Sequence, residues 1–253
     1  AIPMTYTIEK ITTLIGARRY GTADANIAFL LTDSRSLCFP EETLFFAIKS
    51  ERNDGHKYIQ NLYLRGVRNF VVTSVPDNYQ ARFPQGNFLK VTDTLEALQR
   101  LAERHRDEFN IPIVGITGSN GKTVVKEWLY QVLSPDCFVT RSPRSYNSQI
   151  GVPLSVWLMN DDTKVGVFEA GISKPGEMLA LRDIIQPTIA VLTNLGAAHQ
   201  ENFTSIEAKC KEKLILFHDA QVIAYNADDD TVARLVAASD YKGEKLCWSR
   251  KDA

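Results

Sequence analysis

The sequence lacks the features that mark membrane-embedded, disulfide-rich or nucleic-acid-binding proteins. None of its apolar runs approaches the roughly 18 residues of a membrane-spanning helix, and no signal-peptide pattern opens it. With 29 basic and 30 acidic residues the net charge is −1, so composition predicts neither a nucleic-acid nor a membrane partner. Cysteine is scarce and widely spaced, which excludes a paired metal motif and predicts reduced thiols in the cytoplasm. The four cysteines are Cys38, Cys137, Cys210 and Cys247.

What the sequence contains is typical of a globular protein with two domains. Its 253 residues are 44% hydrophobic and 23% charged, which suits one large core or two smaller ones. Asp93 opens a helical pattern that ends near Phe109, and Pro112 follows, so we place the boundary at 108–111. The predicted domains are 1–109 and 110–253. The first is predicted to contain helices around 8–15 and 59–63 and strands at 44–48 and 70–73.

The second domain alternates between strand-like and helical segments. This alternation predicts an α/β fold whose sheet is mostly parallel and has helices on both faces. In such sheets ligands bind beyond the carboxyl ends of the strands, so the residues that follow each strand are candidates for a site. The predicted strands are 111–116, 137–140, 164–169, 188–193, 221–225 and 244–248.

The stretch 113–123, which reads Ile-Val-Gly-Ile-Thr-Gly-Ser-Asn-Gly-Lys-Thr, is the most informative in the chain. A strand, a glycine-rich loop, Lys-Thr and a helix together hold nucleotide phosphates through backbone N–H groups, the lysine and a hydroxyl that reaches Mg²⁺. The strict Walker pattern requires glycine at 116, where this chain has isoleucine. The alternative is a glycine-rich turn without a ligand. On the helix that follows, we place Val125, Leu129, Val132 and Leu133 on one face.

Polar side chains follow the other predicted strands, and each has an ordinary structural interpretation beside the functional one. Glu169 ends an apolar strand, where it is well placed to hold Mg²⁺ or simply to cap the next helix. His199 alone is more often a structural histidine than a ligand, and Asn147 alone suits a turn. The three lysines of one helix, Lys209, Lys211 and Lys213, would ordinarily form a solvated face.

Taken together and in this order, the motifs resemble those of the ATP-dependent Mur ligases of peptidoglycan synthesis. The motifs that carry the resemblance are Gly115–Thr123, Asn147 with Gly151 and Pro153, Phe168–Gly171 with Gly176 and Glu177, and Thr193-Asn194 with Ala198-His199. The chain is most similar to the branch that adds D-Ala-D-Ala to UDP-MurNAc-tripeptide, and also to the ligase half of a ligase–alanine racemase fusion. The likeness to the D-Ala-D-Ala-adding branch is carried by Glu201, Phe203, Lys211–Lys213, Phe217, Asp33–Arg35, Leu44–Lys49 and Asp54–His56. The likeness to the fusion is carried by Gly121–Trp128.

The resemblance implies an activity and its residues. ATP would phosphorylate the carboxylate of UDP-MurNAc-tripeptide, and the amine of D-Ala-D-Ala would attack the acyl phosphate, in a monomeric enzyme with two Mg²⁺ ions. The implied catalytic residues are Lys122, Glu169, His199 and Lys213. The implied phosphate-loop residues are Gly118, Ser119, Asn120, Gly121, Lys122 and Thr123, with Asn147 at the γ-phosphate and Asn226 near the adenine. The implied metal ligands are Thr123, Glu169, His199 and a carbamylated Lys213, with Lys211 as the alternative. The implied contacts of the UDP end are Asp33, Ser34, Arg35, Lys49 and His56.

Three departures from the family pattern limit these expectations. Ser148 stands where the family usually has a second asparagine, which weakens the γ-phosphate assignment. Ser50 replaces a usual glycine, which weakens the UDP contacts. The family has a third domain that closes over the site, and the chain stops at Ala253. We therefore expect the central domain to be incomplete and this chain alone to be inactive or nearly so.

Other functions compete with this interpretation. Another member of the same superfamily, such as an earlier Mur ligase or a folylpolyglutamate synthase, would share the loop, although the segment Asp33–Arg35 argues against the folate enzyme. A nucleotide-binding module without catalysis is a candidate from another class. A kinase or GTPase is disfavoured because the sequence has neither an apolar strand that ends in Asp nor an Asn-Lys-x-Asp motif.

Overall fold

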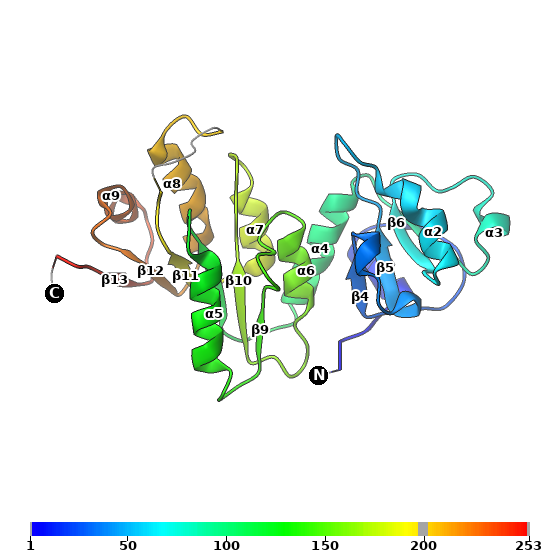
Figure 1. The fold of residues 1–253 in the computed structure, drawn as a ribbon, viewed down its shortest axis with the longest axis horizontal. Helices are drawn as coiled ribbons and strands as arrows, with labels where there is room; N and C mark the ends of the chain where they lie inside the picture. The colour runs from blue at the N-terminus through cyan, green and yellow to red at the C-terminus, as the bar shows by residue number, and fades with distance from the viewer. Residues whose placement is uncertain (1, 197–201, 252–253) are drawn as a thin grey trace. The chain divides into compact units, whose positions relative to one another are not determined.

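The computed structural model describes residues 2–196 and 202–251, and the chain forms two compact units, Ala1–Arg104 and His105–Ala253 (Figure 1). The division lies earlier than the expected boundary at 108–111. It falls near the end of helix α4 (Thr94–Arg106), because the last two residues of that helix belong to the second unit. His105 bonds to the carbonyl of Met159, and Arg106 donates to the carbonyl of Ile185. No helix in the described part of the chain is both long and apolar enough to cross a membrane.

The first unit is built on a five-stranded sheet of order β2-β7-β6-β5-β4, in which only β2 runs antiparallel to its neighbour. The predicted strands and helices are present, and Asp93 caps α4 by accepting bonds from the amides of Leu95 and Glu96. The strands are β2 (Arg18–Tyr20), β4 (Phe29–Leu31), β5 (Thr43–Phe46), β6 (Asn69–Val72) and β7 (Asn87–Lys90), with the pair β1 (Tyr6–Thr7) and β3 (Asn26–Ile27). The helices are α1 (Ile8–Leu14), α2 (Ile59–Leu64), α3 (Tyr79–Arg82) and the short η1 (Ser34–Ser36), η2 (Pro40–Glu42) and η3 (Gly55–Tyr58).

The second unit is a six-stranded sheet of order β13-β12-β11-β8-β10-β9, and every neighbouring pair is parallel. All six predicted strands are present, and the expected α/β class with a mostly parallel sheet is confirmed. The strands are β8 (Ile113–Thr117), β9 (Val139–Arg141), β10 (Val165–Glu169), β11 (Ile189–Leu192), β12 (Val222–Asn226) and β13 (Glu244–Trp248). The helices are α5 (Lys122–Leu133), α6 (Gly151–Trp157), α7 (Met178–Ile185), α8 (Ile206–Leu214), η4 (Ile215–Phe217) and α9 (Asp230–Ala238).

The strand order places a ligand crevice at β8. From β8 the chain first builds β9 and β10 on one side and then crosses to β11 on the other side. Such a reversal is the point where open parallel sheets bind ligands, beyond the carboxyl ends of the strands. Strand β8 is buried along its whole length, as expected for a central strand covered on both faces. The loop that follows it therefore opens at the switch point.

Candidate phosphate and metal site

The loop between β8 and α5 depends on two glycines. Gly121 precedes α5 with a φ of +83°, a left-handed conformation that glycine adopts at little cost. Gly118 has a φ of +146°, and a Cβ there would clash with Oγ1 of Thr193. The predicted strand, loop and helix are all present, and the backbone conformation explains why two of its positions are glycine.

The end of β11 holds this loop from the side. Asn194 accepts the amide of Ser119 with its carbonyl (3.0 Å) and the amide of Asn120 with Oδ1 (3.1 Å). The Thr193 hydroxyl donates to the carbonyl of Asn120 at 2.6 Å. The amides of Ser119 and Asn120 are thus already used, whereas within residues 2–196 and 202–251 the amides of 121–123 have no acceptor. These three amides open α5, where the helix dipole favours an anion.

Lys122 and Thr123 begin α5 and face the crevice. The Lys122 ammonium donates to the carbonyl of Gly118 at 2.8 Å. Burial lowers the pKa of Lys122, the Glu169 carboxylate opposes that shift, and Lys209 adds to it. The Thr123 hydroxyl lies 3.1 Å from each carboxylate oxygen of Glu169. The loop therefore joins a cation, a hydroxyl and a carboxylate at one point.

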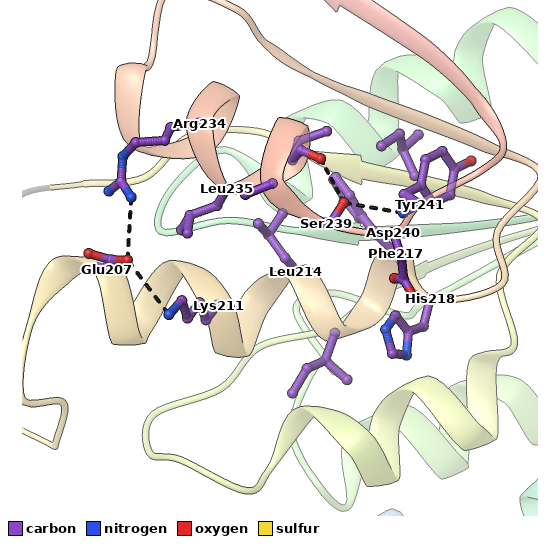
Figure 2. Close-up of a pocket in the computed structure, with 14 residues that line it drawn as sticks. Glu207, Lys211, Leu214, Phe217, His218, Arg234, Leu235, Ser239, Asp240 and Tyr241 are labelled. Atoms are coloured by element: carbon purple, nitrogen blue, oxygen red, sulfur yellow. Dashed lines mark hydrogen bonds and ion pairs between the residues drawn. The ribbon is translucent and has the colours of Figure 1, made fainter.

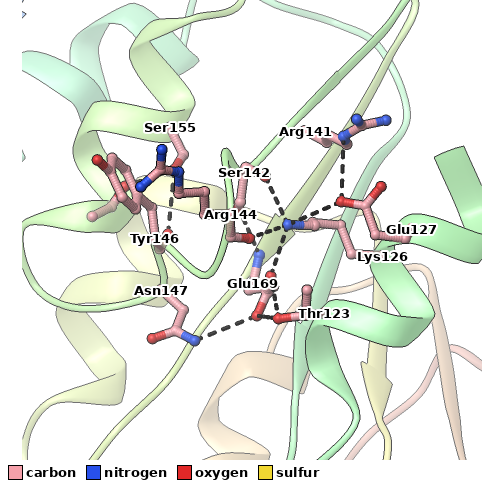
Figure 3. Close-up of polar contacts among 11 residues, drawn as sticks. Thr123, Lys126, Glu127, Arg141, Ser142, Arg144, Tyr146, Asn147, Ser155 and Glu169 are labelled. Carbon is pink, nitrogen blue, oxygen red and sulfur yellow. Dashed lines mark hydrogen bonds and ion pairs between the residues drawn. The ribbon is translucent and has the colours of Figure 1, made fainter.

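Glu169 is completely buried at the end of β10, next to β8 (Figure 3). Its Oε1 also accepts a bond from Nδ2 of Asn147 at 3.3 Å, and its Oε2 forms an ion pair with Nζ of Lys126 at 3.1 Å. The alternative that Glu169 caps the next helix is wrong, because α7 begins after Glu177 instead. Glu169 is therefore a fixed acceptor in the crevice, and Asn147 points at it rather than forming only a turn.

Sequence analysis missed Lys126, a fully buried member of this cluster. The predicted apolar face of α5 is also partly wrong. Val132 is 70% exposed, whereas Val125, Leu129 and Leu133 pack on the core. A signal was present in the spacing, because residues three apart lie on the same side of a helix and Lys126 follows Thr123 by three.

The lysines of α8 do not form one solvated face. Lys209 and Lys213 are buried, whereas the Lys211 side chain is 64% exposed and pairs with Glu207 at 3.6 Å. Burial, together with the charges of Lys122 and Lys209, lowers the pKa of Lys213 to about 8. Lys213 therefore lies on the phosphate-loop side, within electrostatic reach of Lys122. His199 and Glu201 lie outside the described residues.

Lys211 instead borders a hollow of about 460 Å³ between α8 and α9 (Figure 2). The floor of this hollow is apolar and includes Leu214 and Leu235, and Glu207 joins Lys211 to Arg234 at its rim. The structure thus separates the two candidate lysines, and Lys213 is the one near the loop. At the end of β12, Asn226 accepts the amide of Asp228 at 2.9 Å, which is an ordinary turn interaction.

The first unit brings together part of the residue set expected at the UDP end. Lys49 and His56 line a cavity of about 460 Å³ with Thr73. His56 accepts the Thr73 amide at Nε2 (3.0 Å), so its Nδ1 donates to Asp54 at 2.6 Å. The backbone amide of His56, and after it this ring bond, lower the pKa of Asp54. Asp33, Ser34 and Arg35 do not line this cavity: Asp33 caps η1 and pairs with the exposed Arg35 at 2.7 Å.

Residues 116–250 match the model of the Mur ligase middle domain. The chain belongs to the Mur ligase family. It is 33% identical over 205 residues to the UDP-N-acetylmuramoyl-tripeptide–D-alanyl-D-alanine ligase of Bacillus subtilis, covering 78% of this chain and 43% of that protein. A crystal structure of MurF from Acinetobacter baumannii superposes with a TM-score of 0.87 at 25% identity, covering 98% of this chain and 54% of that one. MurF from Thermotoga maritima in complex with ADP gives 0.75 at 26% identity, covering 88% and 50%.

The expected resemblance is therefore confirmed at the level of family and fold. The chain spans about half the length of the relatives that it matches. The predicted roles of individual residues remain predictions, and they are taken up as proposals below.

Proposed function

We propose that this chain carries the UDP-sugar-binding and ATP-binding parts of a ligase that joins D-Ala-D-Ala to UDP-MurNAc-tripeptide. The observation that carries the proposal is the contact of the Thr123 hydroxyl with the Glu169 carboxylate beside the loop amides. A hydroxyl and a carboxylate at the start of a phosphate-binding helix are oxygen donors of the kind that Mg²⁺ prefers. Family membership and the names of the relatives support the choice of reaction.

The proposed nucleotide site uses backbone and side chain together. The amides of 121–123 would bind the phosphates of ATP, because they have no acceptor among the described residues. The ammonium of Lys122, which donates to the carbonyl of Gly118, would add its charge. Asn147 would lie near the γ-phosphate, since its amide already reaches the Glu169 carboxylate. Asn226 ends β12 on the same edge of the sheet and is our candidate for the adenine side.

The residues present fit the metal that this chemistry requires. Thr123 and Glu169 would supply two oxygens to one Mg²⁺, and the ion would neutralise charge on the transferring phosphate. His199 and Lys213 are the candidates for a second ion, provided that Lys213 is carbamylated and so carries a negative charge. A pKa near 8 supports this, because it leaves an appreciable fraction of the Lys213 amine neutral and nucleophilic toward carbon dioxide.

The proposed reaction has two steps. A carboxylate oxygen of the UDP-tripeptide attacks the γ-phosphorus, which gives an acyl phosphate and releases ADP. The amine nitrogen of D-Ala-D-Ala then attacks the acyl carbon, the new C–N bond forms, and inorganic phosphate leaves as the amine loses its proton. The protein contributes positioning and charge neutralisation to the first step, and Lys122 provides a positive charge at the phosphate loop.

The first unit is our candidate for the UDP end of the substrate. Lys49 and His56 line its cavity, and Lys49 offers a cation to a diphosphate. A second group lies around η1, outside this cavity, and we assign it a smaller part in binding the UDP end. It consists of Asp33, Ser34 and Arg35.

Calorimetric titration of the chain with UDP-MurNAc-tripeptide tests this function. We expect binding of the UDP-tripeptide and weaker or no binding of UDP-MurNAc and of folate. A Lys49→Ala variant should lose affinity, whereas Lys90→Ala, at a lysine outside this cavity, should not. Binding of ATP without any binding of the UDP-tripeptide would favour a nucleotide-binding module instead. Binding of folate would favour a folylpolyglutamate synthase.

A further inference from the structure

We propose that Lys126 is a positioning residue that fixes the Glu169 carboxylate and the segment 142–147 in one arrangement for the metal-bound nucleotide. This proposal rests on the proposed function of the loop. It adds a residue that belongs neither to the phosphate loop 115–123 nor to the expected metal ligands.

The contacts of Lys126 join three parts of the second unit (Figure 3). Its Nζ lies 3.1 Å from Oε2 of Glu169 and 2.8 Å from the carbonyl of Ser142, and it also bonds the carbonyl of Arg144. An ammonium has three protons to donate, and these partners match that number. Glu127, the next residue, lies 3.4 Å away with a half-exposed carboxylate. Lys126 therefore links α5, the end of β10 and the segment after β9.

The segment that Lys126 holds carries a further contact to the same carboxylate. The backbone amide of Glu169 donates to the Ser142 hydroxyl at 3.0 Å, and Nδ2 of Asn147 donates to Oε1 of Glu169. Between them Arg144 has a φ of +47°, a conformation that a residue with a side chain adopts only when its surroundings hold it. Because Lys126 binds the Arg144 carbonyl, it stabilises this turn and with it the approach of Asn147.

The two oxygens of the Glu169 carboxylate have different partners, which points to a positioning role for Lys126. Lys126 holds Oε2 from inside the protein, whereas Asn147 bonds only Oε1, and the Thr123 hydroxyl reaches both oxygens. Partners that hold a metal ligand in place commonly change metal affinity about 10- to 100-fold when they are removed. The alternative is that Lys126 serves only the stability of the unit, as a buried ion pair.

Arg106 provides a matched control for this alternative. It is also a buried cation, 6% exposed, and it donates to the carbonyls of Ile185, Gln186 and Phe109. These carbonyls precede β11 and β8, so Arg106 lies at the amino edge of the parallel sheet, opposite the phosphate loop. Replacing Arg106 removes a buried cation without touching the site.

The test measures the affinity of the chain for ADP by calorimetry, with and without Mg²⁺. The quantity compared between variants is the ratio of the association constant with Mg²⁺ to the association constant without it. In Lys126→Met we expect this ratio to fall by about tenfold or more, with metal-free ADP affinity within about twofold of the parent. In Arg106→Met we expect an unchanged ratio. A role in stability alone would lower the melting temperature of both variants and leave both ratios unchanged.

An unchanged ratio in folded Lys126→Met would overturn the proposal. Should that variant fail to fold, Lys126→Arg keeps the charge but replaces the ammonium by a planar fork, which cannot bond the same three partners. A ratio in Lys126→Arg within about twofold of the parent would then overturn the proposal as well. Absence of any ADP binding by the folded parent would instead contradict the proposed function of the loop, and this proposal with it.

Discussion

Lys126 and Lys213 are two buried lysines on the two helices beside the loop, and they differ in what surrounds them. Lys126 is fully buried and faces a carboxylate and two carbonyls. Lys213 is 3% exposed and faces the charges of Lys122 and Lys209. A buried charge that is paired holds its partners in place, whereas one among like charges favours losing its charge. The first environment suits a structural cation, and the second suits an amine that can be modified.

The largest expected difference between the lysines is in their reaction with carbon dioxide, which tests the claim that Lys213 is the one that can be modified. We expect a carbamate carbon signal by ¹³C NMR when the chain is kept in ¹³C-labelled bicarbonate above pH 8. The signal should be lost completely in Lys213→Ala, because only a neutral amine reacts. It should persist in Lys211→Ala, the control on the exposed side of the same helix. A signal lost in Lys211→Ala instead would reverse the assignment.

Removing Lys126 should cost far more stability than removing Lys213. Lys126→Met leaves Glu169 buried without its ion-pair partner, which typically costs about 3–5 kcal/mol. Lys213→Met removes repulsion from the interior and should be neutral or stabilising, within about 1 kcal/mol. Urea unfolding of both variants at pH 7 measures the difference. Equal losses would show that the two environments do not differ as described.

The pH dependence of stability should carry the signature of Lys213. Its pKa is about 8 in the folded chain and near its ordinary 10.5 when unfolded, so between these values the unfolded state binds more protons. The free energy of unfolding of the parent relative to Lys213→Met should then rise with pH from about 8 to 10, by at most about 1.4 kcal/mol per pH unit. Below pH 8 the difference should be constant. Urea unfolding in carbonate-free buffer checks this, and a flat difference across pH 7–10 would contradict it.

A substitution at Gly118 tests the phosphate loop beside both lysines, with a smaller expected effect. Gly118→Ala places a Cβ against Thr193 Oγ1 and should cost about 1–3 kcal/mol and weaken ADP binding. Gly176→Ala is the matched control, because Gly176 also has positive φ but no atom lies within 4 Å of its Cβ position. That variant should cost about 1 kcal/mol and leave ADP binding unchanged. Similar losses of ADP affinity in both would contradict the role of the loop.

Much of the second unit was predictable because β8, β10, β11 and β12 are largely apolar runs and its loop has a distinctive glycine and lysine spacing. In the sheet of the first unit β2, β4 and β7 were missed, although β5 and β6 are just as short as β7 and were predicted from their apolar residues. Strand β7 also carries Asn87, whose side-chain amide donates to the carbonyl of Ala23 and to Oδ1 of Asn69, both of them tertiary bonds. Short strands of this kind take their identity from neighbours that are distant in the sequence.

The candidate site was predictable in its residue types more than in its orientations. Spacing shows that Lys209 and Lys213 share a side of α8 and that Lys211 does not, but only the sheet decides which side is buried. The burial of Lys126 likewise depends on the rotation of α5 against β10, which leaves Val132 exposed instead. His199 and Glu201, which fall outside the described residues, stay predictions.

The most direct test of the account is the effect of Mg²⁺ on ADP affinity in the parent and in Glu169→Gln, measured by calorimetry on the folded chain. Glutamine keeps the shape of Glu169 but removes the charge that a divalent cation requires. The account predicts that Mg²⁺ strengthens ADP binding in the parent and that Glu169→Gln abolishes most of this gain while metal-free ADP still binds. Equal gains from Mg²⁺ in both proteins would contradict the metal site at Thr123 and Glu169.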